Sequence, residues 1–532
     1  MYPAKQHVIK TCQQLCALLP ESERTKPQVL LLAGEIVHYR NDTDREIAFR
    51  QESNFYYLSG CDTPDSHLLV AFQAGTSLDT KPEIELFIPE ITSEILMWSV
   101  PPPSLAAAIE THDVTGVQNI AALPQAIEKL IKALPGALFH CLPRGSPEFP
   151  VVSEDFLKPV LSADGLAVTD AFLLSALHQA RLLKDAYEVD LIRKACDVSS
   201  RAHEVVMRVL GAAVKGEIKA NTATGRPLLP SEWLIEKEAE AEAIFVASFR
   251  REGAVHAAYL PIVAASTRAA TLHYCCNGGN NREFSWGPRA AGDHVNTSSL
   301  SAGKELKPQV LLLDAGCEWT NYAADITRTM PIGNGGKFTP EAKDIYSLAC
   351  MEIIKPGIHW DAVHLLSHRV LTQGFQRLGI FKSPSSPNSG SWASEEAILA
   401  SGITTAFYPH GLGHSLGMDV HDVPSASKPA VNPSIETGII LGHPDFYKYL
   451  RLRLKLETGM VVTVEPGIYF NPHFLNNIRD SKLIDHEVLK RYENVGGVRI
   501  EDVVEITANG MTNLTKVPSD VEWLEGVCSG AL

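Results

Sequence analysis

The sequence predicts a chain of two domains, a smaller α/β domain over residues 1–180 and a larger α+β domain over residues 181–532. Three observations predict this. The chain has 532 residues, which is more than one hydrophobic core ordinarily organises. Its first third alternates short apolar runs with helix-like stretches. An amphipathic segment from Arg181 to about Leu210 then marks the start of the second domain.

Composition and charge are those of an acidic globular protein. Hydrophobic residues make up 45% and charged residues 20% of the chain, which is typical of packed domains. With 47 basic and 62 acidic residues the formal net charge is -15, and this disfavours nucleic acid as a partner. The chain has neither the apolar core of a signal peptide nor a membrane-length apolar stretch, and its ten cysteines form no CxxC pair. We therefore expect a cytoplasmic protein with reduced thiols that does not bind a membrane.

Apolar runs predict the strands of each domain. In the first domain they lie at Val29–Ala33 and Leu68–Phe72. In the second domain β-rich runs alternate with helical sequence and lie at Tyr259–Ala265, Val310–Leu313, Met460–Val464 and Val498–Ile506. Polar stretches at about 213–231, 277–308 and 382–391 predict loops.

Two acidic residues stand at the ends of apolar runs in the second domain. Asp314 ends the run Val310–Leu313, and we expect Asp325 to lie on the next strand, within Tyr322–Arg328. Two strands joined by a short connection would set these carboxylates side by side, where their repulsion requires a compensating cation. Either aspartate taken alone would be interpreted as a turn or capping residue.

Three histidines stand close together further along the chain. His410, His414 and His421 fall within twelve residues. The HExxH helix of zincin metalloproteases is excluded, because Gly411 follows His410 and Gly413 follows soon after. Taken singly, each histidine would be a hydrogen-bonded structural residue.

Two more acids end strand-like runs near the C-terminus. Glu465 closes the β-branched run Val461–Val464 and is followed by Pro466, and a buried acid must find a partner. Period-two geometry places Arg499 and Glu501 on one face of a strand. By itself this second pattern also fits an ion pair on a solvated surface.

The four acids together indicate a metal site. Asp314, Asp325, Glu465 and Glu501 would bring four negative charges into buried surroundings, and two divalent cations would neutralise them. Oxygen ligands with one imidazole favour a hard ion such as Mn²⁺ over a thiolate-bound zinc. The sequence therefore predicts two divalent metal ions per subunit, with Mn²⁺ preferred.

At these residues the chain resembles the creatinase and methionine aminopeptidase superfamily, which has the pita-bread fold, and within it the Xaa-Pro aminopeptidases (aminopeptidase P) and prolidases. The matching runs are DITRT at 325–329, PHGLGH at 409–414, DVHD at 419–422 and VEPG around Glu465. In that family two Asp, one His and two Glu bind the metals in this chain order. The resemblance implies the metal ligands Asp314, Asp325, His414, Glu465 and Glu501.

The resemblance also implies catalytic roles for the other residues. His273, His410 and His421 would line the substrate site, and His421 would polarise the scissile carbonyl. Glu465 would accept and relay a proton. Arg499 is similar to the arginine that stands beside the last ligand in the family.

One run in the first domain distinguishes the branches of the superfamily. Arg50–Gly60 is similar to the RQxxxFYYLxG run of the N-terminal domain, which methionine aminopeptidases lack. The resemblance thus implies a creatinase-like N-terminal domain joined to a pita-bread catalytic domain. It implies a metallo-exopeptidase that removes the first residue from peptides with proline in second place, and a homo-oligomer, commonly a dimer.

Three alternatives remain open. A prolidase that cleaves only Xaa-Pro dipeptides would share the metal site. A non-catalytic pita-bread protein would bind a partner, but such proteins lose ligands that this chain keeps. A creatinase-like hydrolase of a small non-peptide would not need the acidic dinuclear site.

The chain departs from the family pattern between two of the named residues. About 40 residues separate His273 from Asp314, and the stretch 277–308 has the composition of an insertion. A surface loop, an active-site lid and an error in the gene model would each account for it.

Overall fold

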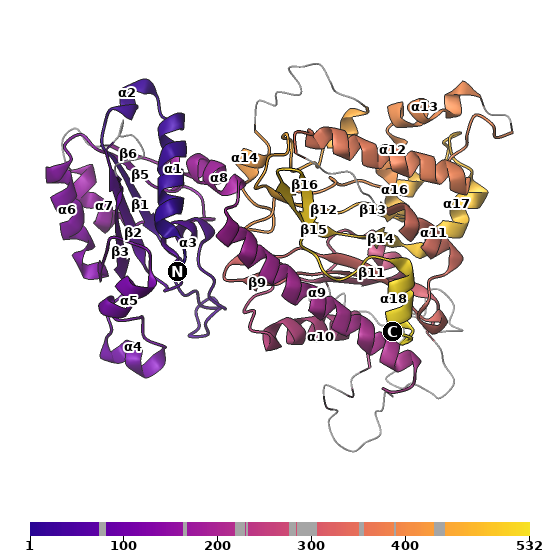
Figure 1. Ribbon diagram of the computed structural model, residues 1–532, viewed down its shortest axis with the longest axis horizontal. Coiled ribbons are helices and arrows are strands. Elements are labelled where there is room, and N and C mark those ends of the chain that lie inside the picture. The colour runs from indigo at the N-terminus through magenta and orange to yellow at the C-terminus, as the bar shows by residue number, and fades with distance from the viewer. Residues whose placement is uncertain are drawn as a thin grey trace. The chain divides into compact units, whose positions relative to one another are not determined.

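A computed structural model describes residues 1–73, 81–162, 167–218, 234–275, 306–349, 356–387, 390–429 and 442–532, together with residues 229, 232 and 284. The chain divides into two compact units, Met1–Leu183 and Lys184–Leu532, which Figure 1 colours from indigo to magenta and from magenta to yellow. Most of the loop expected at 277–308 and most of the loop expected at 213–231 lie outside the described residues.

The first unit is built on a mixed sheet with strand order β4-β3-β2-β1-β5-β6. The strands are β1 (Gln28–Ala33), β2 (His67–Phe72), β3 (Glu83–Ile88), β4 (Gly116–Asn119), β5 (Leu138–His140) and β6 (Ala167–Thr169). The two central strands β1 and β2 pair antiparallel and are buried along their whole length. The apolar runs expected as strands in this unit are therefore its core.

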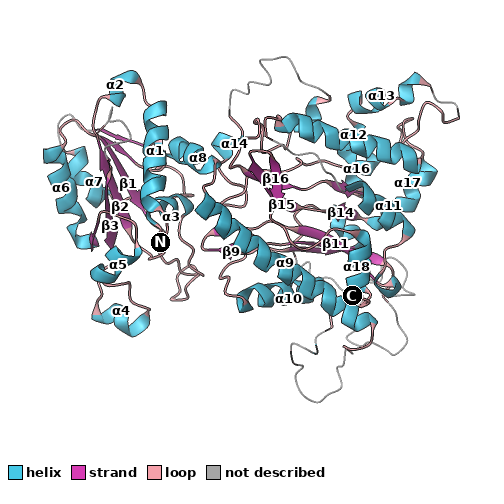
Figure 2. Cartoon of the chain, viewed as in Figure 1, coloured by secondary structure: helices cyan, strands magenta, loops and turns pink. Residues whose placement is uncertain are grey.

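Helices cover both faces of this sheet. The helices of the unit are α1 (Ala4–Leu18), α2 (Glu21–Arg24), α3 (Ser53–Ser59), α4 (Ser93–Trp98), α5 (Leu105–Thr111), α6 (Leu123–Ala133), α7 (Glu154–Leu161) and α8 (Leu173–Leu182), with a short 3₁₀ turn η1 at Ile120–Ala122. Neither α2 nor α4 has a buried residue. Figure 2 shows α6 and α7 on one face and α1 on the other. The run Arg50–Gly60 forms the buried helix α3, which Glu52 caps at its start and Gly60 ends with φ of 63°.

The described residues of the second unit form four small antiparallel sheets. Their orders are β11-β8-β7, β12-β15-β16, β13-β14 and β10-β9. The strands are β7 (Ile262–Ala265), β8 (Gln309–Asp314), β9 (Glu318–Trp319), β10 (Tyr322–Ala323), β11 (Thr327–Ile332), β12 (Val461–Val464), β13 (Gly467–Tyr469), β14 (Gly497–Arg499), β15 (Asp502–Thr507) and β16 (Gly510–Asn513).

Helices surround these strands (Figure 1). They are α9 (Ala186–Val214), α10 (Glu238–Arg251), α11 (Pro340–Ala349), α12 (Trp360–Leu378), α13 (Glu395–Ala400), α14 (Pro424–Ser427), α16 (Pro472–Asn476), α17 (His486–Tyr492) and α18 (Val521–Cys528). Short 3₁₀ turns are η3 (Ser266–Ala270), η5 (Asn334–Gly336), η6 (Ser391–Ala393), η7 (Ile403–Ala406), η8 (Pro444–Tyr447) and η9 (Glu493–Val495). In the described part of the chain, none of the helices combines the length and the apolar character needed to cross a bilayer.

The predicted amphipathic segment differs from the observed helix at its start. The expected helix begins near Arg181, whereas α8 ends at Leu182 and α9 begins at Ala186. Asp185 caps the new helix, because its side chain accepts the amide of Glu188 while the Glu188 side chain accepts the amide of Asp185. This reciprocal pair starts a new helix and leaves Lys184 outside both.

Candidate metal centre and active site

The first two acids meet at one tyrosine. β8 and β11 pair antiparallel with Asp314 opposite Thr327, and Asp325 lies two residues before β11 rather than on it. The Tyr259 hydroxyl lies 2.5 Å from Asp314 Oδ1 and 2.6 Å from Asp325 Oδ1. The strand pairing therefore brings both carboxylates to a single phenol.

His414 faces the same acids from another part of the chain. Its Nε2 lies 3.3 Å from Asp325 Oδ2 and 3.6 Å from Glu465 Oε1. Its Nδ1 donates to the carbonyl of Ser415 over 3.1 Å, and its backbone amide donates to Thr463 Oγ1. Because Nδ1 is bonded to that carbonyl, Nε2 is the ring nitrogen that faces the carboxylates, the arrangement found in metal-binding histidines.

Glu501 joins the group through the end of β11. Thr327 Oγ1 donates to Glu501 Oε2 over 2.7 Å, and the Glu501 amide donates to the carbonyl of Thr327. Donor atoms of Asp325, His414 and Glu501 all lie within 4.8 Å of one another. The buried Arg328 donates to the carbonyls of Thr327 and Glu501, which ties the two segments together.

Arg499 is the cation that this cluster contains. One terminal nitrogen of its guanidinium lies 2.5 Å from Asp314 Oδ2, and the other donates to the Tyr469 hydroxyl over 2.9 Å. His410 lies on the far side of that hydroxyl, with Nε2 at 2.9 Å, and its Nδ1 donates to the carbonyl of Gly411. A chain of contacts thus runs from Asp314 through Arg499 and Tyr469 to His410.

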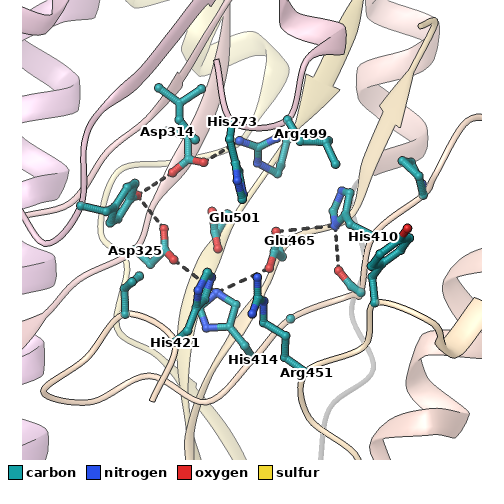
Figure 3. A pocket seen from close by; sticks show the side chains of 18 of the residues that line it. His273, Asp314, Asp325, His410, His414, His421, Arg451, Glu465, Arg499 and Glu501 are labelled. Carbon is teal, nitrogen blue, oxygen red and sulfur yellow. Dashed lines mark hydrogen bonds and ion pairs between the residues drawn. The ribbon is translucent and has the colours of Figure 1, made fainter. Parts of the chain in front are cut away.

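A cavity of about 530 Å³ opens over the acids. Figure 3 shows the four carboxylates turned toward a common centre, with His273 on one side and His414 and His421 on another. His273 and His421 are exposed, whereas His414 is buried, and the rings of His414 and His421 meet edge to face at 4.5 Å. Nine side chains that the sequence indicated therefore line one cavity: His273, Asp314, Asp325, His410, His414, His421, Glu465, Arg499 and Glu501.

Burial is the largest influence on the pKa values of the four carboxyl groups. It raises the pKa of Glu465 to about 7 and, reinforced by the charge of Asp325, raises the pKa of Glu501 well above its ordinary value. Burial also raises the pKa of Asp314, although Arg499 opposes it. For Asp325 burial is outweighed by the hydrogen bond and charge of His414, so its pKa is lowered.

The pKa values of the three histidines also move in different directions. Burial, with Arg499 nearby, lowers the pKa of His410 to about 3. Desolvation within the cavity that His421 lines, with His414 nearby, lowers the pKa of His421 to about 3, although part of its ring is open to solvent. Burial also opposes protonation of His414, but the hydrogen bond to Asp325 and the charge of Glu465 leave its pKa raised. His410 and His421 are therefore neutral near pH 7 and able to make directional hydrogen bonds.

The donor set fits hard divalent cations. Three buried carboxylates and the half-buried Glu465 line the cavity, and only Arg499 is bonded to one of them as a cation among the described residues. Such an excess of largely buried negative charge is stable only with further cations. The raised pKa values of Glu465 and Glu501 express that deficit, and a bound cation would favour the ionised carboxylates. Oxygen donors with one imidazole are the ligands that manganese-type ions accept.

Comparison with known proteins places this geometry in a family. The model of metallopeptidase family M24 matches residues 190–508. The chain belongs to this family. The model of the aminopeptidase P N-terminal domain matches residues 5–139, so the resemblance and the two-domain fold inferred from the motifs are confirmed.

Relatives of this M24 chain match it over its full length. The probable Xaa-Pro aminopeptidase PEPP of Paracoccidioides brasiliensis (strain Pb18) is 34% identical, over 98% of this chain and 97% of that protein. The probable Xaa-Pro aminopeptidase PEPP of Pyricularia oryzae is 34% identical, over 100% and 97%. Proline aminopeptidase P II from Yersinia pestis has a TM-score of 0.69 at 25% identity and 99% coverage of both chains. A variant of Escherichia coli aminopeptidase P in complex with substrate has a TM-score of 0.69 at 25% identity and 98% coverage of both.

Three residues of the M24 site escaped the sequence analysis. Tyr259 opened a run interpreted as a strand, and its hydroxyl role depends on acids 55 and 66 residues away. Tyr469 follows the VEPG run without a polar signal of its own. Arg451 lines the cavity near His421 (Figure 3) and stands in an unremarkable basic stretch. Of the three, Tyr469 alone stands next to a recognised motif, and its nearness to VEPG was the one available signal.

Two glycines allow close contact between segments of the M24 unit that carry candidate metal ligands. A Cβ atom on Gly316 would lie 1.8 Å from the carbonyl oxygen of Ala324, the residue before Asp325. A Cβ atom on Gly413 would lie 2.0 Å from the carbonyl oxygen of Thr463. Backbone therefore packs directly on backbone at both places, and only glycine allows it.

Proposed function

We propose that this M24 chain is a metal-dependent aminopeptidase that removes the N-terminal residue from peptides with proline in second place. The observation that carries the proposal is the convergence of five ligand-type side chains, far apart in the sequence, around one buried centre: Asp314, Asp325, His414, Glu465 and Glu501. Relatives named Xaa-Pro aminopeptidase, which match over the whole length, support the substrate class.

These five side chains would hold two divalent cations, most suitably Mn²⁺. Asp325, His414 and Glu501 offer donor atoms at the mutual spacing of ligands to one ion. When bound, such ions lower the pKa of a water molecule and polarise a carbonyl. The number of ions and their identity are part of the proposal.

Side chains of the protein would carry out proton transfer, stabilise the scissile carbonyl oxygen and position Asp314. Glu465 lines the cavity and would accept a proton on its carboxylate and pass it to the leaving nitrogen. His421, exposed in the cavity and neutral, would donate a hydrogen bond to the scissile carbonyl oxygen, a contribution of about 3 to 4 kcal/mol for a well-placed donor. Arg499 would hold Asp314 in place.

Recognition of proline must rely on shape, because a tertiary amide has no N–H to donate. His273 and His410 line the cavity on either side of the acids (Figure 3). Both would contact the substrate backbone, with His410 held in place by Tyr469 and the carbonyl of Gly411. Residues 181–532 would be the catalytic domain and residues 1–180 the accompanying aminopeptidase P-like domain.

We also propose a cytoplasmic homodimer. The described cysteines are free thiols, which is typical of a reducing compartment. Three exposed apolar side chains lie together at the end of α4, with Met97 at 68%, Trp98 at 76% and Val100 at 92% exposure, and such patches mark association surfaces. Light scattering after chromatography tests the dimer, and a monomer at micromolar concentration refutes it.

Product analysis tests the function. The purified chain is incubated with Xaa-Pro-Yaa peptides, with and without added Mn²⁺, and the released residue is identified. We expect free Xaa and intact Pro-Yaa with the metal. The Asp325→Asn variant serves as a blank. Release of nothing, by a protein shown to bind the metal, would instead indicate a non-catalytic binding protein.

One observation favours a second candidate, a prolidase restricted to Xaa-Pro dipeptides. Arg451 is exposed in the cavity near His421 (Figure 3), where a guanidinium would pair with the free carboxylate of a dipeptide. Comparing Xaa-Pro with its C-terminal amide tests this. A strong preference for the free acid, lost in Arg451→Met, would assign the dipeptidase.

A second cavity supports the longer substrates. Its volume is about 610 Å³, and it shares Pro409, Tyr449 and Phe474 with the first cavity. Residues beyond proline would extend past these three side chains. A peptide length series separates the candidates, because only the aminopeptidase should act on four residues or more.

A further inference from the structure

The segment that carries His273 is tied to one buried carboxylate. Glu238, the first residue of α10, has no exposed surface. Its Oε1 accepts the backbone amide of Ala265 over 2.8 Å and Nε of Arg268 over 2.7 Å. Its Oε2 accepts the hydroxyl of Tyr274 over 2.7 Å. One side chain therefore binds the beginning, the middle and the end of a single segment.

These bonds determine the direction of His273. Tyr274 is buried at 8% exposure, whereas its neighbour His273 is exposed and lines the cavity. An antiparallel bridge between Ile262 and Cys275 holds the backbone just beyond them. His273 ends a turn with Leu272, directly before the buried Tyr274. With Tyr274 anchored in the interior and Cys275 held by its bridge, the turn leaves the His273 side chain facing the acids (Figure 3).

The carboxylate suits this work better than a neutral group. Three donors converge on it, one of them the charged guanidinium of Arg268, and hydrogen bonds to an ionised acceptor are about twice as strong as neutral ones. It also lies in the first turn of α10, where the helix dipole favours negative charge. The segment is further held with Ser266 at a φ of 57°, a conformation that persists only when its surroundings enforce it.

We propose that Glu238 and Tyr274 are positioning residues that orient His273 toward the substrate. The inference rests on the proposed function, because it gives His273 a substrate to contact. Neither Glu238 nor Tyr274 is among the described residues that line the cavity. Both therefore act through His273 and not on the substrate.

A double-mutant cycle tests the inference in the full-length, metal-loaded protein. Tyr274→Phe removes one hydroxyl and keeps the ring in the core. We expect it to lower kcat/KM about tenfold in the unsubstituted protein and less than twofold in the His273→Ala background, since coupled residues lose additivity on this scale. Tyr492→Phe is the matched control, because Tyr492 is also buried and donates to a carboxylate, Asp344. It should leave kcat/KM unchanged.

Amide hydrogen exchange gives a second readout that does not need activity. Tyr274→Phe should speed exchange in the segment 266–275, and Tyr492→Phe should not. Equal losses from Tyr274→Phe with and without His273, or unchanged exchange in the segment, would overturn the inference. An unsubstituted protein that binds metal but releases no residue from Xaa-Pro-Yaa would refute the proposed function instead, and the exchange result would still decide the positioning role.

Discussion

The buried ion pair between Lys184 and Asp422 gives a sharp test of how the site is held. Lys184 Nζ lies 2.8 Å from Asp422 Oδ2, and each side chain is only 1% exposed. The backbone amide of Lys184 donates to the carbonyl of Gly459, and that of Asp422 donates to the carbonyl of Ser415. The pair thus supports the turn between His414 and His421, two of the residues that face the acids.

The expected loss of stability follows from the burial of both charges. Lys184→Met leaves a buried carboxylate without its cation, and Asp422→Asn leaves a buried ammonium without its anion. Each change should cost about 3–5 kcal/mol of unfolding free energy, because the remaining buried charge loses its ion-pair partner in a low-dielectric interior. Against a typical total of about 5–15 kcal/mol, this is a large share. The double variant removes both charges and should cost far less than the sum of the two.

Urea unfolding and kcat/KM of the two single variants and the double variant provide the assay. The surface pair Arg479–Glu493, with side chains 39% and 27% exposed, is the control, and Arg479→Met should cost under about 1 kcal/mol. The reasoning would be wrong if the double variant lost as much stability as the two single variants together. It would also be wrong if a single variant lost no more stability than the surface control. Activity should fall with the single variants, since His421 adjoins Asp422.

Three further predictions follow from the site and the first unit. Asp325→Asn and Glu501→Gln should abolish both metal binding and turnover, because each removes a ligand and a neutralising charge; metal analysis of purified variants showing full occupancy with normal turnover would contradict this. Asn477→Trp fills the second cavity and should raise KM at least severalfold for four-residue peptides while leaving Xaa-Pro dipeptides unaffected; an equal change for both lengths would count against the extended groove. Burial lowers the pKa of His140 in the folded state to about 4, so the unfolded chain gains its proton first as pH falls below 6.5, and stability is lost between pH 6.5 and 4. That loss is about 3 kcal/mol, and His140→Gln should reduce the slope of the first unit's stability against pH, measured by exchange of the β5 amides.

The sequence alone predicted the acids of the site because each one ends or follows an apolar strand. Such positions are recognisable from local pattern, and the order Asp, Asp, His, Glu, Glu added the resemblance. Glu501 lies between β14 and β15, where the predicted continuous run Val498–Ile506 is interrupted. An apolar run that predicts one continuous strand can thus form two strands, with the residue between them directed into the site.

The contacts that complete the site could not be predicted. Tyr259, Arg451 and the Lys184–Asp422 pair depend on distances between segments as much as 238 residues apart, and local pattern carries no such information. By contrast, the start of α9 was within reach, since Asp185 and Glu188 have the spacing of a capping box. That signal was masked by the apolar periodicity that continues across the break.

Gly316 and Gly413 limit the substitutions that this protein can accept. Each stands where one stretch of main chain rests on another, and the smallest possible side chain would already push them apart. Substitutions around the cavity would leave both backbone contacts intact, whereas any side chain at Gly316 or Gly413 would force the two segments apart. Peptide specificity could therefore change through substitutions in the cavity, while the backbone packing beneath the cavity stays the same.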